Sequence, residues 1–248
     1  MIEDRVAAAP LNTAASADLT PPQRWARWTL ASLAAVLLWD LAGGDLAVAR
    51  WFGNANGFAL QSQWFMVHIA HEGARDAAWL LAIALSAGIW WPWGPLRRLP
   101  RSRRVQMVVA ALLALAAMSL LKRWSSTSCP WELNEFGGAV PYVSHWSWGR
   151  SDGGGGHCFP AGHASAGFAF LRGYFVFAHT DARTAGRWLV AALVAGALLG
   201  LAQQMRGAHF LSHTLWTAWL CWTCGWLCDL ATTAWRQARR SPTTAPLR

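Results

Sequence analysis

Long apolar runs separated by short polar stretches form the main pattern of the chain. Five runs approach the roughly 20 residues that an α-helix needs to cross a bilayer, and a sixth is interrupted by Arg172. The pattern therefore predicts an all-α protein, a six-helix transmembrane bundle. The helices are expected at about 26–42, 76–93, 105–121, 163–181, 186–205 and 210–232.

Composition supports a multi-pass membrane protein. Of the 248 residues 54% are hydrophobic and 13% charged, and 19 are tryptophan, whereas soluble domains carry about 25% charged residues. Residues 1–23 lack the charged start and apolar core of a signal peptide, and we interpret them as a disordered cytoplasmic tail. The membrane domain is expected over 24–235, followed by a basic cytoplasmic tail over 236–248.

The net charge of +9 is unevenly distributed between the two predicted membrane faces. Arginines crowd the two tails and the loops at 94–104 and 179–187, whereas the loops at 50–75, 122–162 and 206–209 hold few. Since positive residues stay cytoplasmic, both termini are predicted on the inner side of a bacterial inner membrane. The surplus then reflects topology, so no nucleic-acid partner is expected, and no protein partner is implied.

The five cysteines fall into two groups. Cys129 and Cys158 lie in one predicted periplasmic loop, where the compartment is oxidising, which predicts a disulfide, with two unpaired thiols as the alternative. Between them, Gly153 to Gly156 are interpreted as a flexible hinge. The remaining three, Cys221, Cys224 and Cys228, share one helical face and are expected to pack rather than to bind a metal.

Ionisable side chains from three separate segments gather at the predicted outer face. The set comprises Lys122, His163, Arg206, His209 and His213. Charged groups at membrane depth are costly and usually functional. Each has a structural explanation when taken alone: lysine and arginine snorkel at helix ends, and His209 with His213 has the spacing of a metal pair. Their coincidence on one face is not covered by these explanations.

Together these residues have the chemistry of a phosphate site. Lysine and arginine would neutralise phosphate oxygens. The segment from Pro160 to His163 leads into a predicted helix N-terminus, where free amides favour an anion, and Gly162 permits a close backbone approach. Histidine can attack phosphorus as a nucleophile or protonate a leaving oxygen.

Three segments resemble the signature motifs of the type-2 phosphatidic acid phosphatase family, the membrane relatives of the vanadium haloperoxidases. The family's first motif is Lys, six residues, Arg-Pro, and its second is Pro-Ser-Gly-His. Its third is Ser-Arg, five residues, His, three residues, Asp. The corresponding residues here are Lys122 with Cys129-Pro130, then Pro160-Ala161-Gly162-His163, then Ala202-Gln203 with His209 and His213. The resemblance covers roughly residues 60–230.

The resemblance implies a role for each matching residue. His209 would be the nucleophile that forms a phosphohistidine, and His163 the general acid. Lys122 would bind the phosphoryl oxygens together with the backbone amide of Gly162. No cofactor and no metal are expected.

Four positions depart from the family pattern. Cys129 and Gln203 replace two phosphate-binding arginines, Ala161 replaces a serine, and His213 stands where the family aspartate orients the nucleophile. Arg206, nearly one helical turn from Gln203, is the candidate to supply one guanidinium, and Arg123 is a weaker candidate for the other.

The resemblance implies a lipid phosphatase that removes phosphate from a lipid phosphate or diphosphate. Two alternatives remain open. A phosphotransferase would pass the phosphoryl group to another lipid instead of water, and a scaffold or metal-binding protein would use His209 and His213 without catalysis.

Overall fold

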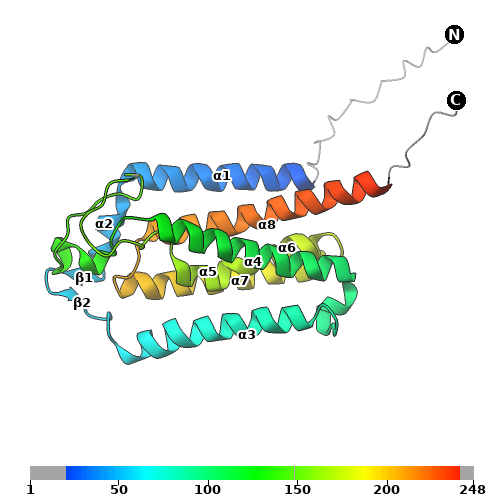
Figure 1. Ribbon diagram of the computed structural model, residues 1–248, viewed down its shortest axis with the longest axis horizontal. Coiled ribbons are helices and arrows are strands. Elements are labelled where there is room, and N and C mark those ends of the chain that lie inside the picture. The colour runs from blue at the N-terminus through cyan, green and yellow to red at the C-terminus, as the bar shows by residue number, and fades with distance from the viewer. Residues whose placement is uncertain (1–20, 148, 241–248) are drawn as a thin grey trace, which may run out of the picture.

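Long helices lie side by side along one axis in the computed structural model, which describes residues 21–147 and 149–240 (Figure 1). Loops and short elements cover one end. In chain order the elements are α1 (Pro21–Ala42), α2 (Gly44–Ala49), β1 (Gly53–Asn54), β2 (Gly57–Phe58), η1 (Phe65–Gly73), α3 (Ala74–Ala87), η2 (Gly94–Arg98), α4 (Arg101–Trp124), η3 (Pro130–Glu132), η4 (Asn134–Phe136), α5 (Gly162–Phe168), η5 (Ala169–Leu171), α6 (Arg172–Ala178), α7 (Ala182–Met205) and α8 (Leu211–Arg240).

The all-α prediction is confirmed, because the two antiparallel strands β1 and β2 are only two residues each. The predicted fourth segment corresponds to α5, η5 and α6 in direct succession, and Arg172 is helical and only 2% exposed. Of the predicted tails, residues 1–20 and 241–248 lie outside the described residues. The last helix, α8, extends to Arg240, so the predicted C-terminal tail begins as helix.

The second predicted helix was wrong in position. Helical structure begins with the π-helical turn η1 at Phe65 and ends with α3 at Ala87, instead of spanning 76–93. The second half of the predicted loop 50–75 is therefore helix. Gly88 and Pro92 explain the early end, because glycine is a poor helix former and proline cannot continue the hydrogen-bond ladder.

Close packing of α5 on α7 fixes the centre of the bundle. A Cβ atom added to Gly167 would lie 2.2 Å from the backbone nitrogen of Gly196, and one added to Gly196 would lie 2.3 Å from the Phe168 ring. Glycine at both positions lets the two backbones approach. This contact places the first turn of α5, where His163 lies, against α7.

A buried ion pair joins α4 to α8 at the end of the bundle away from the covering loops. Arg103 Nη1 lies 2.8 Å from Asp229 Oδ1, and the two side chains are 9% and 3% exposed. Gln106 donates to the same carboxylate, and His179 Nε2 lies 2.9 Å from its other oxygen. Arg103, counted above among the arginines of the 94–104 loop, is thus a buried partner of α8.

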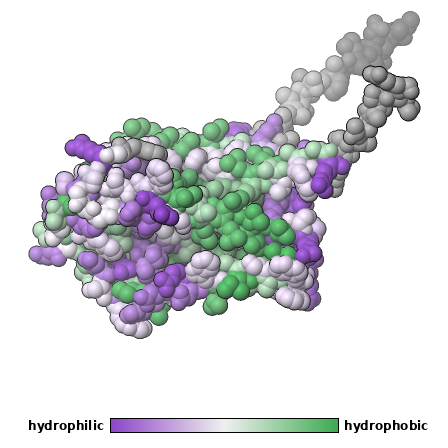
Figure 2. Space-filling model, in the orientation of Figure 1, coloured by the Kyte–Doolittle hydropathy of each residue, from purple (hydrophilic) through white to green (hydrophobic). Residues whose placement is uncertain are grey.

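On the face that Figure 2 shows, hydrophobic side chains gather over the middle of the helices. Large hydrophobic side chains remain exposed on several helices, such as Leu30, Leu80, Ile83, Leu113 and Leu198. Of the described helices, α4 and α7, with 24 residues each, are long and apolar enough to cross a membrane.

We predict that Gly167→Ala destabilises the protein, because the new methyl group would meet backbone that has no side-chain freedom to move aside. Overpacking costs typically about 1–3 kcal/mol, which should appear as a lower midpoint of thermal unfolding in detergent. Gly186→Ala is the matched control, since a Cβ atom there meets nothing within 4 Å and gains helix propensity in α7. Equal midpoints for the two variants would contradict this account.

Candidate functional site

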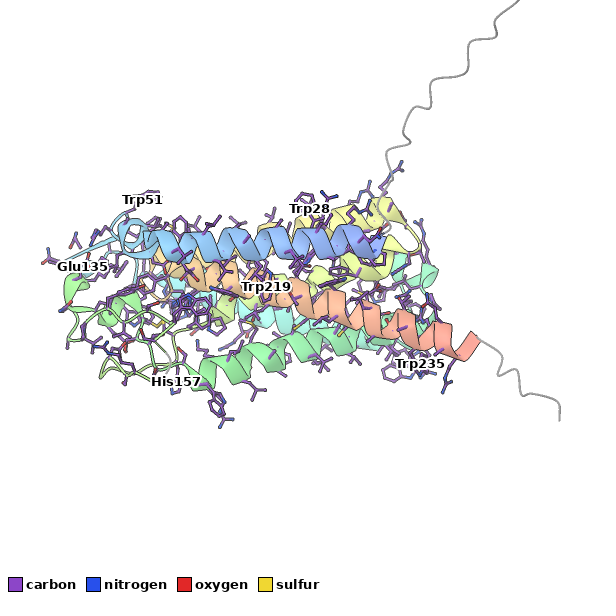
Figure 3. All side chains as sticks on the ribbon, turned by 90° about the horizontal axis from the view of Figure 1, so that it is seen from above. Trp28, Trp51, Glu135, His157, Trp219 and Trp235 are labelled. Carbon is purple, nitrogen blue, oxygen red and sulfur yellow. A yellow bond between two sulfur atoms is a disulfide. The ribbon has the colours of Figure 1, made fainter. Side chains whose placement is uncertain are left out.

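Three helix ends meet at the end of the bundle that the loops cover (Figure 1). Lys122 lies in the last turn of α4, His163 in the first turn of α5, and His213 in the first turn of α8, with His209 just before it. His157 and Glu135, which belong to the covering loops, lie at the same end (Figure 3). The structure therefore brings together the three segments that the sequence singled out.

Backbone hydrogen bonds join the segment after α4 to the segment before α5. The amide of His157 donates to the carbonyl of Ser125 at 2.8 Å, and the amide of Cys158 donates to that of Thr127 at 3.1 Å. Trp131 donates to the carbonyl of Gly207, ahead of α8. The phosphatase-like motifs are thus connected through main-chain contacts as well as side chains.

A disulfide joins Cys129 to Cys158, with their Cα atoms 5.2 Å apart and a sequence separation of 29. It links the segment that follows Lys122 directly to the turn that precedes His163. The glycines between the two cysteines are required for space. A Cβ atom at Gly154 would lie 2.2 Å from Ser128 Oγ, and Gly156 has a φ of 62°. Close approach, which the hinge interpretation did not include, therefore accounts for these two glycines.

The lysine lies against the predicted anion-binding turn. A Cβ atom built on Gly162 would be 3.6 Å from Lys122 Nζ, so the ammonium group lies in van der Waals range of this turn. Among residues 21–147 and 149–240, no carboxylate forms an ion pair with Lys122. Its charge is available to an anion.

His209 and His213 form a buried pair. They are 3% and 2% exposed, and their Nδ1 atoms lie 3.5 Å apart. Burial, reinforced by the charge of Lys122, holds the pKa of His209 well below its usual value. His209 is therefore neutral at physiological pH, the state in which an imidazole nitrogen is nucleophilic.

His163 stacks on a histidine that sequence reasoning missed. The rings of His71 and His163 are 3.6 Å apart at their centroids and inclined by 30°. His71 belongs to η1, and such π-helical turns are often found at functional sites. The sequence did contain a signal for His71, because it is an ionisable residue just before a predicted span. That segment was interpreted as loop.

Arg206 lies beside the glutamine that replaces the family arginine. It is 8% exposed, and its Nη1 donates to Gln203 Oε1 at 3.2 Å, while Nε donates to the carbonyl of Gln61. The positive charges of Arg206 and Lys122 both act on His163. Arg123, by contrast, is exposed, because successive helix residues point about 100° apart and Lys122 takes the inward direction.

His145 and Asp40 were also missed by sequence reasoning, and both lie behind the histidine pair. The His145 ring lies edge-on to His213, with centroids 5.8 Å apart, and its Nε2 is 3.3 Å from Asp40 Oδ2. Asp40 lies in the last turn of α1. An acidic residue at the end of an apolar run was a usable signal, because such groups are costly in a membrane.

A metal site fits these residues poorly. Ligand atoms of Cys158, His209 and His213 lie within 4.8 Å of one another. However, the disulfide uses the sulfur of Cys158 and so removes the thiolate. Two imidazoles are fewer than the three protein ligands typical of a catalytic zinc.

Two apolar cavities open beside the site. One of about 200 Å³ is lined by Gly162 and His163 together with residues of α3 and α4. A second, of about 700 Å³, runs between α3 and α7 and is lined by small side chains such as Ala77, Ala166 and Ala195.

A comparison with known protein families relates this site to one of them. A family model described as the PAP2 superfamily matches residues 104–239, more than half of the chain. The chain belongs to this family. The PAP2 match includes Lys122, His163, His209 and His213, and it supports a phosphoric ester hydrolase in general. The comparisons with curated proteins and with solved structures found no match.

We predict that the disulfide stabilises the outer end. By loop-closure entropy a bridge across a loop of this length contributes about 3–4 kcal/mol, so Cys129→Ser with Cys158→Ser should unfold at a lower temperature. The free cysteines Cys221, Cys224 and Cys228 provide the internal comparison in mass spectrometry after thiol labelling. Full labelling of Cys129 and Cys158 in active protein purified without reductant would show that no brace exists.

Proposed function

We propose that this protein is an integral membrane phosphatase that hydrolyses a lipid phosphate or lipid diphosphate through a phosphohistidine intermediate. The observation that carries the proposal is the meeting of Lys122, His163 and a buried, neutral His209 in the frame of the PAP2 motifs. A nucleophile, an acid and an unpaired cation are the groups that phosphoryl transfer requires.

In the proposed first step, His209 Nε2 attacks phosphorus while the bond to the leaving oxygen breaks. His163 gives its proton to that oxygen. In the second step, water attacks the phosphohistidine, returns a proton to His163 and frees His209 with inorganic phosphate. A proton on His209 Nδ1 would be directed at His213, since the two Nδ1 atoms lie 3.5 Å apart.

Positive charge would hold the phosphoryl group. The ammonium group of Lys122 lies near Gly162, and the guanidinium of Arg206 lies beside Gln203. The stack of His71 on His163 would keep the acid's ring in one orientation. These groups would act at the transition state, where the charge of the transferred phosphoryl group is spread over its three equatorial oxygens.

A membrane location follows from surface and charge. The helices expose large apolar side chains that water would not favour, and the arginine-rich loop between α3 and α4 lies at the end away from the site. We propose six membrane crossings, formed by α1, η1 with α3, α4, α5 to α6, α7 and α8. Both termini would then be cytoplasmic and the site periplasmic, in a bacterial inner membrane.

A lipid is the substrate class that the cavities favour. Both lie next to α3 and α5 and are lined mainly by apolar side chains, and the smaller one is lined by His163 itself. A phosphate at the membrane face, with its chains in these grooves, would bring the ester to the histidines. Phosphatidic acid, phosphatidylglycerol phosphate, undecaprenyl diphosphate and a lipid A phosphate all have this form.

Phosphate release by the solubilised protein from these four lipids tests the proposal, with and without a chelator. Release that survives the chelator supports the histidine mechanism. Transfer of phosphate to an added lipid acceptor would favour the phosphotransferase alternative, and no turnover of any lipid would favour the scaffold. Activity abolished by the chelator would favour a metal centre.

We predict that His209→Ala and His163→Ala each lower kcat by a factor of about 10² or more, the loss expected when covalent or acid catalysis is removed. Trapping with radiolabelled substrate separates the two roles, since only His209→Ala should abolish the phosphohistidine outright. Near-normal turnover by folded His209→Ala protein would disprove its assignment.

Arg206 gives a separate prediction. Arg206→Ala should greatly reduce kcat/KM, and Arg206→Lys should restore part of it, because lysine keeps the charge but lacks the planar fork. Arg123→Ala is the matched control, since that side chain is exposed. Normal kinetics in Arg206→Ala would mean that the phosphate is held differently.

A further inference from the structure

The nucleophile of this protein has a histidine where its family has a carboxylate. A carboxylate bonded to the nucleophilic imidazole orients it and stabilises the positive charge that the ring acquires when it bonds to phosphorus. His213 can accept the Nδ1 proton of His209, at 3.5 Å, but carries no negative charge itself. The charge must be compensated from elsewhere.

A buried carboxylate, that of Asp40, lies next to His145, which in turn contacts His213. Asp40 and His145 are side chains with 5% and 6% exposure, and the His145 Nε2 faces Asp40 Oδ2 at 3.3 Å. The His145 ring contacts His213 edge-on at 5.8 Å between centroids. His145 and Asp40 thus continue the His209–His213 pair, and the resulting series of neighbouring side chains ends at a carboxylate.

The carboxylate of Asp40 is held in place rather than neutralised. Its Oδ2 accepts hydrogen bonds from the indoles of Trp146 and Trp216 at 2.9 Å and 2.8 Å. Within the described residues, its Oδ1 has no hydrogen-bond partner. A buried polar atom left unpaired calls for an explanation, and a catalytic role is one of them.

The carboxylate of Asp45, by contrast, has a structural role. Asp45 accepts from the amide and hydroxyl of Ser212 and from the Trp39 indole, so its oxygens anchor the start of α8. Asp40 makes no such contact with α8 backbone among the residues described. Of the two acids, Asp40 is therefore the one free to respond to charge on the histidines.

Aromatic rings exclude water from this line of residues. Phe159 stacks on His145 with centroids 4.4 Å apart, and both Phe159 and Phe210 lie edge-on to His213 at 5.3 Å. In such surroundings a charge acts more strongly across one intervening ring than it would in water.

We propose that Asp40 and His145 are positioning residues that supply, through His213, the negative charge that the family obtains from a directly bonded aspartate. This inference rests on the proposed phosphatase function. When His209 Nε2 bonds to phosphorus and the leaving oxygen takes the His163 proton, the His209 Nδ1 proton shifts toward His213 Nδ1. The resulting imidazolium is stabilised by the charge of the Asp40 carboxylate, whose Oδ2 lies 3.3 Å from His145 Nε2. Hydrolysis of the phosphohistidine returns the proton to His209.

The charged and titratable groups around His145 and His213 come from four helices and two loops. They are Asp40 of α1, Asp45 of α2, Lys122 of α4, the paired His145 and His213, and His209. Of these, only Asp40 and Asp45 are acidic, so replacing Asp40 removes one of two sources of negative charge at this position.

The test is a double-mutant cycle between Asp40→Asn and His213→Asp, measured as kcat against pH on the lipid that the wild type hydrolyses best. Asp40→Asn should lower kcat about tenfold or more, less than the ~10⁴ lost when a directly bonded carboxylate is replaced. It should also move the acid limb of the profile to lower pH, because a cation at His213 loses its counter-charge. His213→Asp should be active, and adding Asp40→Asn to it should change little.

His145→Phe is the second variant, since it keeps the ring stacked on Phe159 but removes both nitrogens. It should reproduce the kinetic effect of Asp40→Asn. Glu135→Gln, which removes an exposed ion pair with Arg50 at the same end, should leave kcat unchanged. Thermal unfolding of each variant identifies any loss that is only structural.

Binding of orthovanadate, which bonds to histidine Nε2, gives a readout that needs no turnover. Weaker vanadate binding in Asp40→Asn, restored in the double variant, supports the inference. Wild-type kcat and pH profile in both Asp40→Asn and His145→Phe would overturn it, as would an equal loss from Asp40→Asn in the His213→Asp background or an inactive His213→Asp protein. A wild type that neither binds vanadate nor releases phosphate would overturn the proposed function, and this inference with it.

Discussion

The covalent bond between Cys129 and Cys158 is the contact on which the arrangement of the site depends. Lys122 and His163 lie on different helices, and the chain between them has no long helix to fix their separation. The disulfide, with the Ser125–His157 and Thr127–Cys158 hydrogen bonds, ties the segment after Lys122 to the segment before His163. Where the family has an arginine bound to phosphate, this chain has a cross-link. We infer that the bridge performs part of the organising task of the lost guanidinium.

The opposite ends of the bundle use charge in different ways. Away from the site, Arg103 and Asp229 are paired and buried, so their charges cancel and join α4 to α8. At the site, Lys122 has no carboxylate partner in the described chain, and the buried imidazole of His209 is neutral. Unpaired positive charge next to neutral histidines suits an anion that arrives from outside. Buried charges that are paired thus form a structural contact at one end of the bundle, and an unpaired charge forms a candidate anion-binding site at the other.

Sequence reasoning was most successful where one local rule decided the outcome. Apolar runs predicted α7 to within a few residues, because a buried or lipid-facing helix must be apolar over its whole length. It failed at η1, where histidine and glutamate interrupt the apolar pattern and a helix was taken for a loop. Of those residues, His71 lies against His163, which is a tertiary contact that local pattern cannot reveal.

By itself, the sequence determined the helical class, the candidate residues Lys122, His163, His209 and His213, and the spacing that links them to a family of phosphatases. Helix periodicity and motif spacing are local properties, so they can be recognised without a fold. Only the tertiary structure decided which side chains share the site: it brought in His71 from η1, His145 from a loop and Asp40 from α1, and left Arg123 outside. Those outcomes depend on how the helices pack, which is set by close contacts such as Gly167 on Gly196, between residues far apart in the chain.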